Sequence, residues 1–66
     1  MKITLKDGSV KEYGSPMSVL DIAADISAGL ARAACAGEVD GETVDLRTVV
    51  DRDCRLSILT AKDEHG

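Results

Sequence analysis

Aromatic residues, proline and histidine are almost missing from this sequence. Tyr13 is the only aromatic residue among 66, and the chain holds one proline and one histidine. A core without phenylalanine or tryptophan must be aliphatic, and a chain of this length forms one small domain that is stable by only a few kcal/mol. The sequence therefore leaves little room for a deep active-site cleft.

Long apolar runs are absent as well. No stretch approaches the roughly 18 residues that a membrane-spanning helix needs. The N-terminus also lacks the basic-then-apolar order of a secretory signal. We therefore expect a cytoplasmic protein without a membrane partner.

Positive charge is scarce, with eight basic residues against twelve acidic ones and a net charge of −4. Binding of nucleic acid through its phosphates usually needs the opposite sign. The one basic cluster that we expect is formed by Lys2, Lys6 and Lys11 on the outer face of a first hairpin, where a tRNA backbone could touch them. Because no aromatic residues alternate with these lysines, a solvated face is the favoured interpretation.

Residues with reactive side chains are few and scattered. Cys35 and Cys54 do not have the spacing of a zinc site, and we expect each to be a small buried hydrophobe, with a disulfide or a reactive thiol as alternatives. His65 lies in the terminal tail, where it would make a poor general base. We therefore predict no catalytic, cofactor-binding or metal-binding residue in this chain.

The remaining charged residues are expected to be solvated. The acidic pairs at 51/53 and 63/64 are typical of loops, with a weak metal site as the alternative. Arg32 is expected to pair with Asp25 or Glu38.

The first half of the chain indicates a hairpin and a helix. Residues 1–5 alternate apolar and polar side chains, Asp7-Gly8 supplies a turn, and residues 9–13 run back. Ser18 followed by Asp21 predicts a helix start, and apolar residues then recur at spacings of three and four. We expect the helix to end near residues 27–29, with Gly29 as a left-handed cap, and residues 30–34 to add a short helical turn.

The second half predicts a further hairpin and a last strand. The pattern is extended from Cys35, Asp40-Gly41 forms a turn, and residues 42–46 return. Thr48 and Asp51 repeat the capping signal and predict one helical turn around Val49 and Val50. Residues 55–60 are apolar enough for an interior strand, and residues 61–66 resemble a linker or a frayed end.

This order of elements predicts an α+β fold of the β-grasp (ubiquitin-like) type. Its mixed sheet would consist of two hairpins and a final strand, with one helix packed across it. The glycines at 29, 37 and 41 match neither a phosphate loop nor a dinucleotide fingerprint, because this stretch closes a helix instead of opening one. We therefore interpret its small residues as a close approach of backbone to its neighbours.

Five segments carry a resemblance to a known family. They are "ITLKDGS" at 3–9, "SPMSV" at 15–19, "DISAGLARA" at 25–33, "AGEVDGETVDL" at 36–46 and "LSILTAKDE" at 56–64. Over its whole length the chain resembles the TGS domain, the ubiquitin-like module at the N-terminus of bacterial threonyl-tRNA synthetase. The resemblance implies a TGS domain over residues 1–60 and the start of a linker to the next domain at 61–66.

The resemblance also implies a parent enzyme that attaches threonine to its tRNA using ATP. ATP, magnesium and zinc would be bound in other domains, so that the module is accessory, carries no catalytic residue and contacts those domains. The parent would be a homodimer and this fragment a monomer. Two alternatives stay open, a free-standing ubiquitin-like sulfur carrier and a ligand- or RNA-sensing module of a stringent-response nucleotide synthetase.

Overall fold

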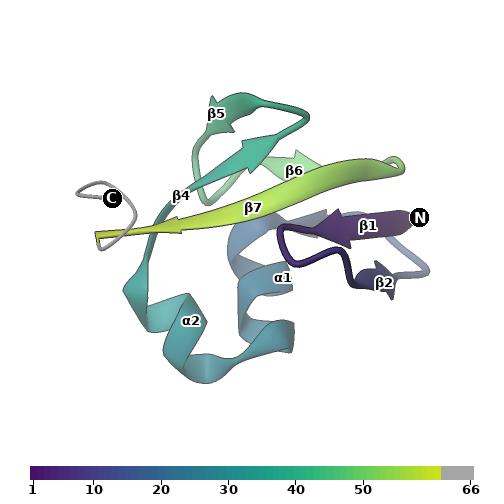
Figure 1. The fold of residues 1–66 in the computed structure, drawn as a ribbon. Coiled ribbons are helices and arrows are strands. Elements are labelled where there is room, and N and C mark those ends of the chain that lie inside the picture. The colour runs from purple at the N-terminus through teal and green to yellow at the C-terminus, as the bar shows by residue number, and fades with distance from the viewer. Residues whose placement is uncertain (62–66) are drawn as a thin grey trace.

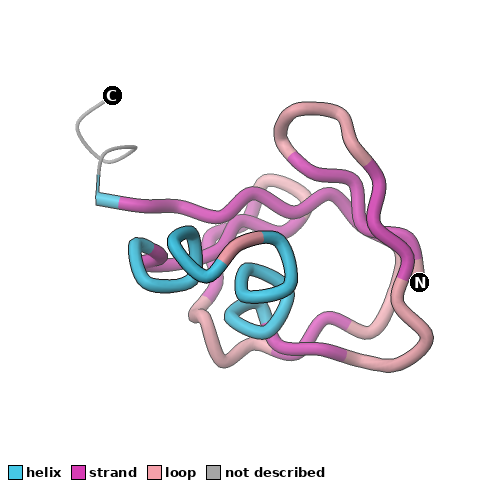
Figure 2. Tube along the Cα trace, turned by 90° about the horizontal axis from the view of Figure 1, so that it is seen from below, coloured by secondary structure: helices cyan, strands magenta, loops and turns pink. Residues whose placement is uncertain are grey.

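The structure is a mixed β-sheet with two short helices packed on one face (Figures 1 and 2). This computed structural model describes residues 1–61. The five-stranded sheet has the order β2-β1-β7-β4-β5, and β3 and β6 form a separate ladder. The strands are β1 (Lys2–Leu5), β2 (Val10–Glu12), β3 (Met17–Ser18), β4 (Ala34–Val39), β5 (Glu42–Val44), β6 (Val49–Val50) and β7 (Cys54–Thr60), and the helices are α1 (Val19–Ile26) and α2 (Ala28–Ala33). The predicted α+β β-grasp class is confirmed, and the short helical turn expected after the first helix is part of a second helix, α2.

Both predicted hairpins form, with different turns. Asp40 and Gly41 make a two-residue loop in which both residues have positive φ (51° and 86°), the geometry that matches the twist of the flanking strands. The first loop is longer, and only Gly8 has positive φ there. Its Asp7 Oδ1 accepts hydrogen bonds from the Ser9 backbone N–H at 2.9 Å and from the Ser9 hydroxyl at 2.6 Å, which stabilise the turn.

Strand β7 is the centre of the sheet, as its apolar sequence predicted. It pairs in parallel with β1 and antiparallel with β4. Its side chains alternate between the helix-covered face, which holds Cys54 and Leu56, and the opposite face, which holds Arg55. Parallel pairing of the first and last strands brings the two halves of the chain into one core.

The core is aliphatic and lies between the sheet and α1. Its buried members are Ile3, Val19, Ile22, Ala23, Val50, Cys54 and Leu56. Helix α1 starts as predicted, because the Ser18 hydroxyl accepts a hydrogen bond from the Asp21 N–H at 3.1 Å. The helix presents Val19, Ile22 and Ala23 to the core.

The prediction that Gly29 caps α1 is wrong. Ser27 ends α1 in an extended conformation and donates its N–H to the Ala23 carbonyl at 2.9 Å, and its hydroxyl accepts from the Leu30 N–H at 3.3 Å. One serine thus ends the first helix and starts the second, so Gly29 lies inside α2. The additional helical turn that the sequence predicted after residue 29 therefore begins earlier, at Ala28.

The predicted helical turn around Val49 and Val50 is also wrong, because these residues form β6 and pair with β3. Both are β-branched and fit a pleated strand better than a helix. The adjacent Thr48 carbonyl accepts a hydrogen bond from the Val19 N–H at 3.0 Å. This ladder therefore ties the loop before β7 to the start of α1.

Neither helix in residues 1–61 is long and apolar enough to cross a membrane. Apart from residue 61, the predicted linker at 61–66 lies outside the described residues. Asp63, Glu64 and His65 therefore lie outside them as well.

Candidate functional site

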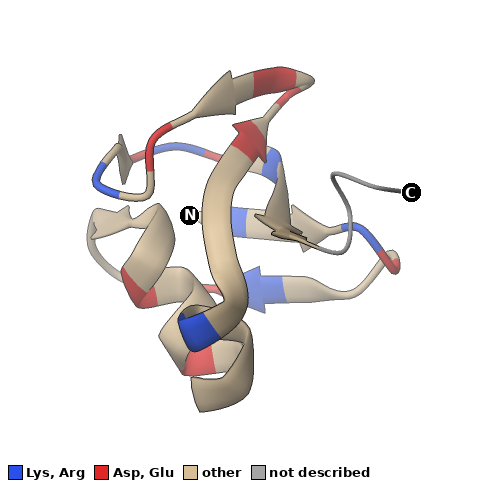
Figure 3. Cartoon of the chain, turned by 90° about the vertical axis from the view of Figure 1, so that its left-hand side faces the viewer, with Lys and Arg blue, Asp and Glu red and all other residues tan. Residues whose placement is uncertain are grey.

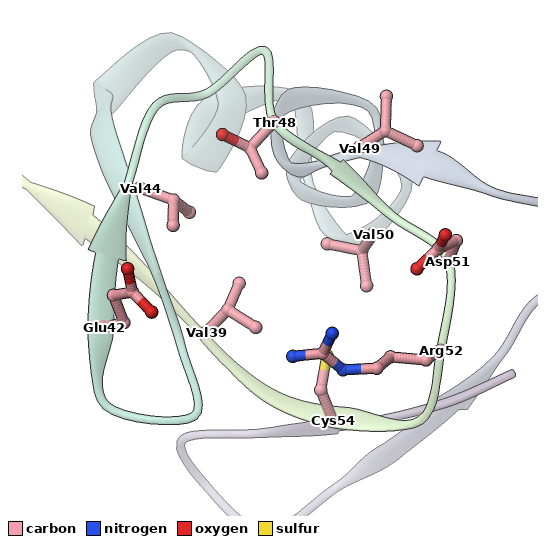
Figure 4. A pocket seen from close by; sticks show the side chains of 9 residues that line it. All are labelled: Val39, Glu42, Val44, Thr48, Val49, Val50, Asp51, Arg52 and Cys54. Atoms are coloured by element: carbon pink, nitrogen blue, oxygen red, sulfur yellow. The ribbon is translucent and has the colours of Figure 1, made fainter.

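A small hollow at one end of the sheet is the candidate site. We call it the valine hollow; it is lined by Val39, Val44, Val49, Val50 and Cys54, with Glu42, Thr48, Asp51 and Arg52 around them. Its volume is about 150 Å³. In Figure 4 the side chains of Val39, Val44 and Val50 point toward the middle of the hollow. The site is thus an apolar floor with a polar rim, large enough for one aliphatic side chain or a molecule of that size.

The loops around the hollow are held by the second hairpin turn. Asp40 Oδ1 accepts a hydrogen bond from the Arg55 N–H at 2.9 Å, and the Asp40 N–H donates to the Arg55 carbonyl at 2.9 Å. Asp40 Oδ2 also lies 3.8 Å from Arg52 Nη2. Both side chains of that ion pair are largely exposed, so it contributes at most about 1 kcal/mol, and the backbone hydrogen bonds position the turn.

Cys54 is a structural thiol. Its side chain is buried in the core beside the hollow, and burial raises its pKa, with the nearby Asp40 carboxylate adding to the rise. Since the nucleophile is the thiolate and a raised pKa keeps the thiol protonated, Cys54 is poorly suited to covalent catalysis. The prediction that Cys54 is a small buried hydrophobe is confirmed.

The same prediction is wrong for Cys35, which is exposed. In the β4–β7 pairing, Ala34 lies opposite Thr60 and Ala36 lies opposite Leu59, so Cys35 is the extra residue of a β-bulge. A bulged residue leaves the alternation of the strand, which explains why its burial could not be predicted from the pattern. Both thiols are free, so a disulfide between them is absent.

The expected lysine cluster does not form on one face. Lys2 lies opposite Glu12, whereas Lys11 lies opposite Ile3, which is buried on the helix-covered face. Because cross-strand partners share a face and successive residues alternate, Lys2 and Lys11 belong to opposite faces of the sheet. Figure 3 likewise shows basic positions scattered among acidic ones. Within residues 1–61, Lys2 and Lys11 therefore do not contribute to one shared basic face as expected.

The other charged residues singled out by the sequence have local roles. Asp53 Oδ1 accepts a hydrogen bond from the Lys2 N–H at 2.7 Å, which ties the loop before β7 to β1. Neither Asp25 nor Glu38 forms an ion pair with Arg32 in residues 1–61, so that predicted pairing is wrong; Asp25 instead accepts a hydrogen bond from the Tyr13 hydroxyl at 2.9 Å.

Within the described part of the chain, no group of three or more His, Cys, Asp or Glu residues is placed to hold a metal ion. Sequence reasoning missed the valine hollow because it assigned Val49 and Val50 to a helix. Two adjacent β-branched residues were the signal that favoured a strand and could have indicated it.

A five-stranded mixed sheet with its helices on one face, and with its first and last strands parallel, places the molecule in the ubiquitin-like β-grasp class. The TGS domain family model matches residues 1–60. The chain belongs to the TGS domain family.

The relatives that it matches are named threonine–tRNA ligases. The chain is 55% identical to that of Hahella chejuensis over 64 residues, which is 97% of this chain. It is 54% identical over all 66 residues to those of Stenotrophomonas maltophilia and Acetivibrio thermocellus. The chain spans only 10% of the length of each of these relatives.

Proposed function

We propose that this chain is the accessory TGS module of a threonine–tRNA ligase, and that the parent enzyme attaches threonine to its tRNA with ATP. The observation that carries the proposal is identity of 53–55% to threonine–tRNA ligases over 97–100% of the chain. The valine hollow has an apolar floor, and burial raises the pKa of the Cys54 thiol that borders it, which fits a binding module better than a reaction centre.

In this proposal, residues 1–60 are the module and residues 61–66 begin the linker to the next domain. ATP, magnesium and zinc act in other domains of the parent, which works as a homodimer in the cytoplasm. The 66-residue chain by itself is a monomer whose partners are those other domains.

The test is aminoacylation by the whole parent chain. Purified parent, ATP and tRNA are incubated with labelled threonine, and acid-precipitable label is counted, with a parallel reaction lacking ATP as the control. The proposal predicts ATP-dependent threonine ester on tRNA. Absence of charging by a folded parent would overturn it. A thiocarboxylate formed at Gly66 by an activating enzyme with ATP and a sulfide donor, which displaces AMP from the acyl adenylate, would identify a sulfur carrier instead.

A further inference from the structure

Helix α2 is held to the domain by few side chains. None of its six residues is buried, and only Leu30 and Ala31 are half-buried, whereas the other four are exposed. Helix α1, in contrast, buries Val19, Ile22 and Ala23. A helix as short as α2 is marginal on its own and depends on the packing of an apolar face. The attachment of α2 therefore depends mainly on Leu30, its one large apolar residue.

The chain can turn at both ends of α2. At one end Ser27 is extended, with φ −168° and ψ 135°. Its N–H completes α1, and its carbonyl starts α2 by accepting a hydrogen bond from the Ala31 N–H at 3.1 Å. Figure 2 shows this joint as the pink segment between the two helices. At the other end Ala34 is extended, and the bulge at Cys35 interrupts the ladder of β4 and β7. Hinges absorb their changes in backbone angle at such element-terminal residues.

An apolar hollow of about 220 Å³ lies against α2, and Leu30 forms one of its walls. The other apolar walls are Leu5, Ile26, Leu56 and Ile58. Empty space beside Leu30 removes packing contacts that a fully enclosed leucine would make. The one large side chain that attaches α2 is therefore incompletely packed.

Gly29 weakens α2 further. Glycine inside a helix is less favourable than alanine because it loses more conformational freedom on folding. The φ of Gly29 is not positive, and a Cβ built there meets only Ser27 Oγ, at an ordinary distance of 3.6 Å. The backbone therefore does not require glycine at this position, and the effect of Gly29 is to lower the stability of the helix.

We propose that α2 is a flap that opens about Ser27 and Ala34 while α1 and the sheet stay folded. Helix α1 stays in place because its core side chains are buried and because the Val19 N–H donates to the Thr48 carbonyl at 3.0 Å. Once detached, a helix of six residues unwinds. Leu30 then leaves the hollow and exposes its remaining apolar walls. The domain thus has a closed and an open state, which differ in the apolar surface that they present to solvent.

The test is amide hydrogen exchange of the 66-residue chain, followed by NMR at several urea concentrations below the unfolding transition. The inference concerns this chain itself and does not depend on the proposed function. The flap predicts that the Ala31 amide is protected at least about tenfold less than the amides of β7, because it exchanges by local opening. Its exchange should also change little with urea, since local opening exposes little surface. Protection and urea dependence equal to those of β7 would overturn the inference.

A core variant separates opening of the flap from unfolding of the whole domain. Ile3 is fully buried and lies outside the hollow. Ile3→Val removes one methyl group from the core and should accelerate exchange of the β7 amides by about two- to tenfold. Because the core stays intact when only α2 opens, exchange of the Ala31 amide should not change. Equal acceleration of Ala31 and β7 would overturn the inference.

A second pair of variants tests whether exchange of Ala31 requires α2 to unwind. Gly29→Ala stabilises the helix and should slow exchange of the Ala31 amide about fourfold. Gly14→Ala adds the same methyl group where no atom lies within 4 Å, and it should leave the ratio of Ala31 exchange to exchange of the other α2 amides unchanged. Unchanged exchange of Ala31 in Gly29→Ala would overturn the inference.

A matched pair of prolines tests the open state directly. Ala31→Pro removes the N–H that starts α2, and Ala24→Pro makes the same change at an exposed alanine of α1. The flap predicts that Ala31→Pro keeps slow exchange in β7 and binds the apolar dye anilinonaphthalene sulfonate more strongly than the unchanged chain, whereas Ala24→Pro loses the protection of β7. Loss of β7 protection in Ala31→Pro, or dye binding no stronger than that of the unchanged chain, would overturn the inference.

Discussion

Replacing Gly37 by alanine tests the closest approach between α1 and the sheet. A Cβ built on Gly37 lies 2.6 Å from Val19 Cγ1 and 3.3 Å from Val19 Cγ2, whereas ordinary contacts begin near 3.4 Å. Val19 is fully buried, and its N–H is bonded to the Thr48 carbonyl at 3.0 Å. The clash therefore meets a stiff β-branched side chain on an anchored backbone.

The size of the effect follows from that geometry. One methyl group must displace Val19 by several tenths of an ångström in a packed core, and overpacking of this kind costs about 1–3 kcal/mol. A domain of this size shifts its melting temperature by about 4–8 °C per kcal/mol. We expect Gly37→Ala to lower the melting temperature by about 5–20 °C, a large part of the total stability of the domain.

The assay is thermal and urea unfolding followed by circular dichroism, with two controls. Gly14→Ala adds the same methyl group where no atom lies within 4 Å and φ is not positive, so it should leave stability unchanged or raise it by about 0.4–1 kcal/mol. Val19→Ala removes the opposing methyl groups, so the double variant should be more stable than the sum of the two single changes predicts. Additive losses, or a Gly37→Ala variant as stable as Gly14→Ala, would refute the reasoning.

Two further predictions concern the phenol and the thiols. Partial burial and the hydrogen bond to Asp25 raise the pKa of Tyr13 from its ordinary value of 10.0 to about 12. As the pH rises, the tyrosine of the unfolded chain loses its proton before that of the folded chain. The free energy of unfolding should therefore fall between pH 10 and pH 12. Absorbance of the single tyrosine should titrate near pH 12, and Tyr13→Phe should lack that part of the pH dependence; a midpoint near 10 would contradict the contact. Cys35 should react with a thiol reagent in the native protein, and Cys54 should react only after unfolding. Rapid reaction of both thiols in the absence of denaturant would contradict the buried position of Cys54.

Local signals predicted the parts of the fold that local contacts stabilise. The two Asp-Gly turns and the Ser18 cap are short-range features, and all three appear where the sequence placed them. The central position of β7 followed from its apolar composition. These elements were sufficient to predict the β-grasp class.

The errors arose where distant partners decide the local structure. Val49 and Val50 become a strand because Met17 and Ser18, more than thirty positions earlier, supply the other side of the ladder. Cys35 is exposed because a bulge against β7 removes it from the alternation of β4. The valine hollow depends on β6, so it could not be predicted once those residues were assigned to a helix.

Ser27 is an error of a different kind, since its signal was local. A serine three residues before Leu30 can cap a helix as well as end one, and the hydroxyl does so at 3.3 Å. The prediction gave priority to Gly29, whose conformational freedom was not needed. Helix α1 ends at Ser27 in an extended conformation, which any residue can adopt.

Threonine-dependent exchange of pyrophosphate into ATP, measured on the parent enzyme with and without residues 1–60, decides whether these residues take part in catalysis. If these residues form an accessory module, the shortened parent should activate threonine within about threefold of the whole chain, a difference below 1 kcal/mol in the barrier. Loss of exchange from a shortened parent that is still folded by circular dichroism would contradict the account. Catalysis would then depend on residues 1–60, to which we assign no catalytic role.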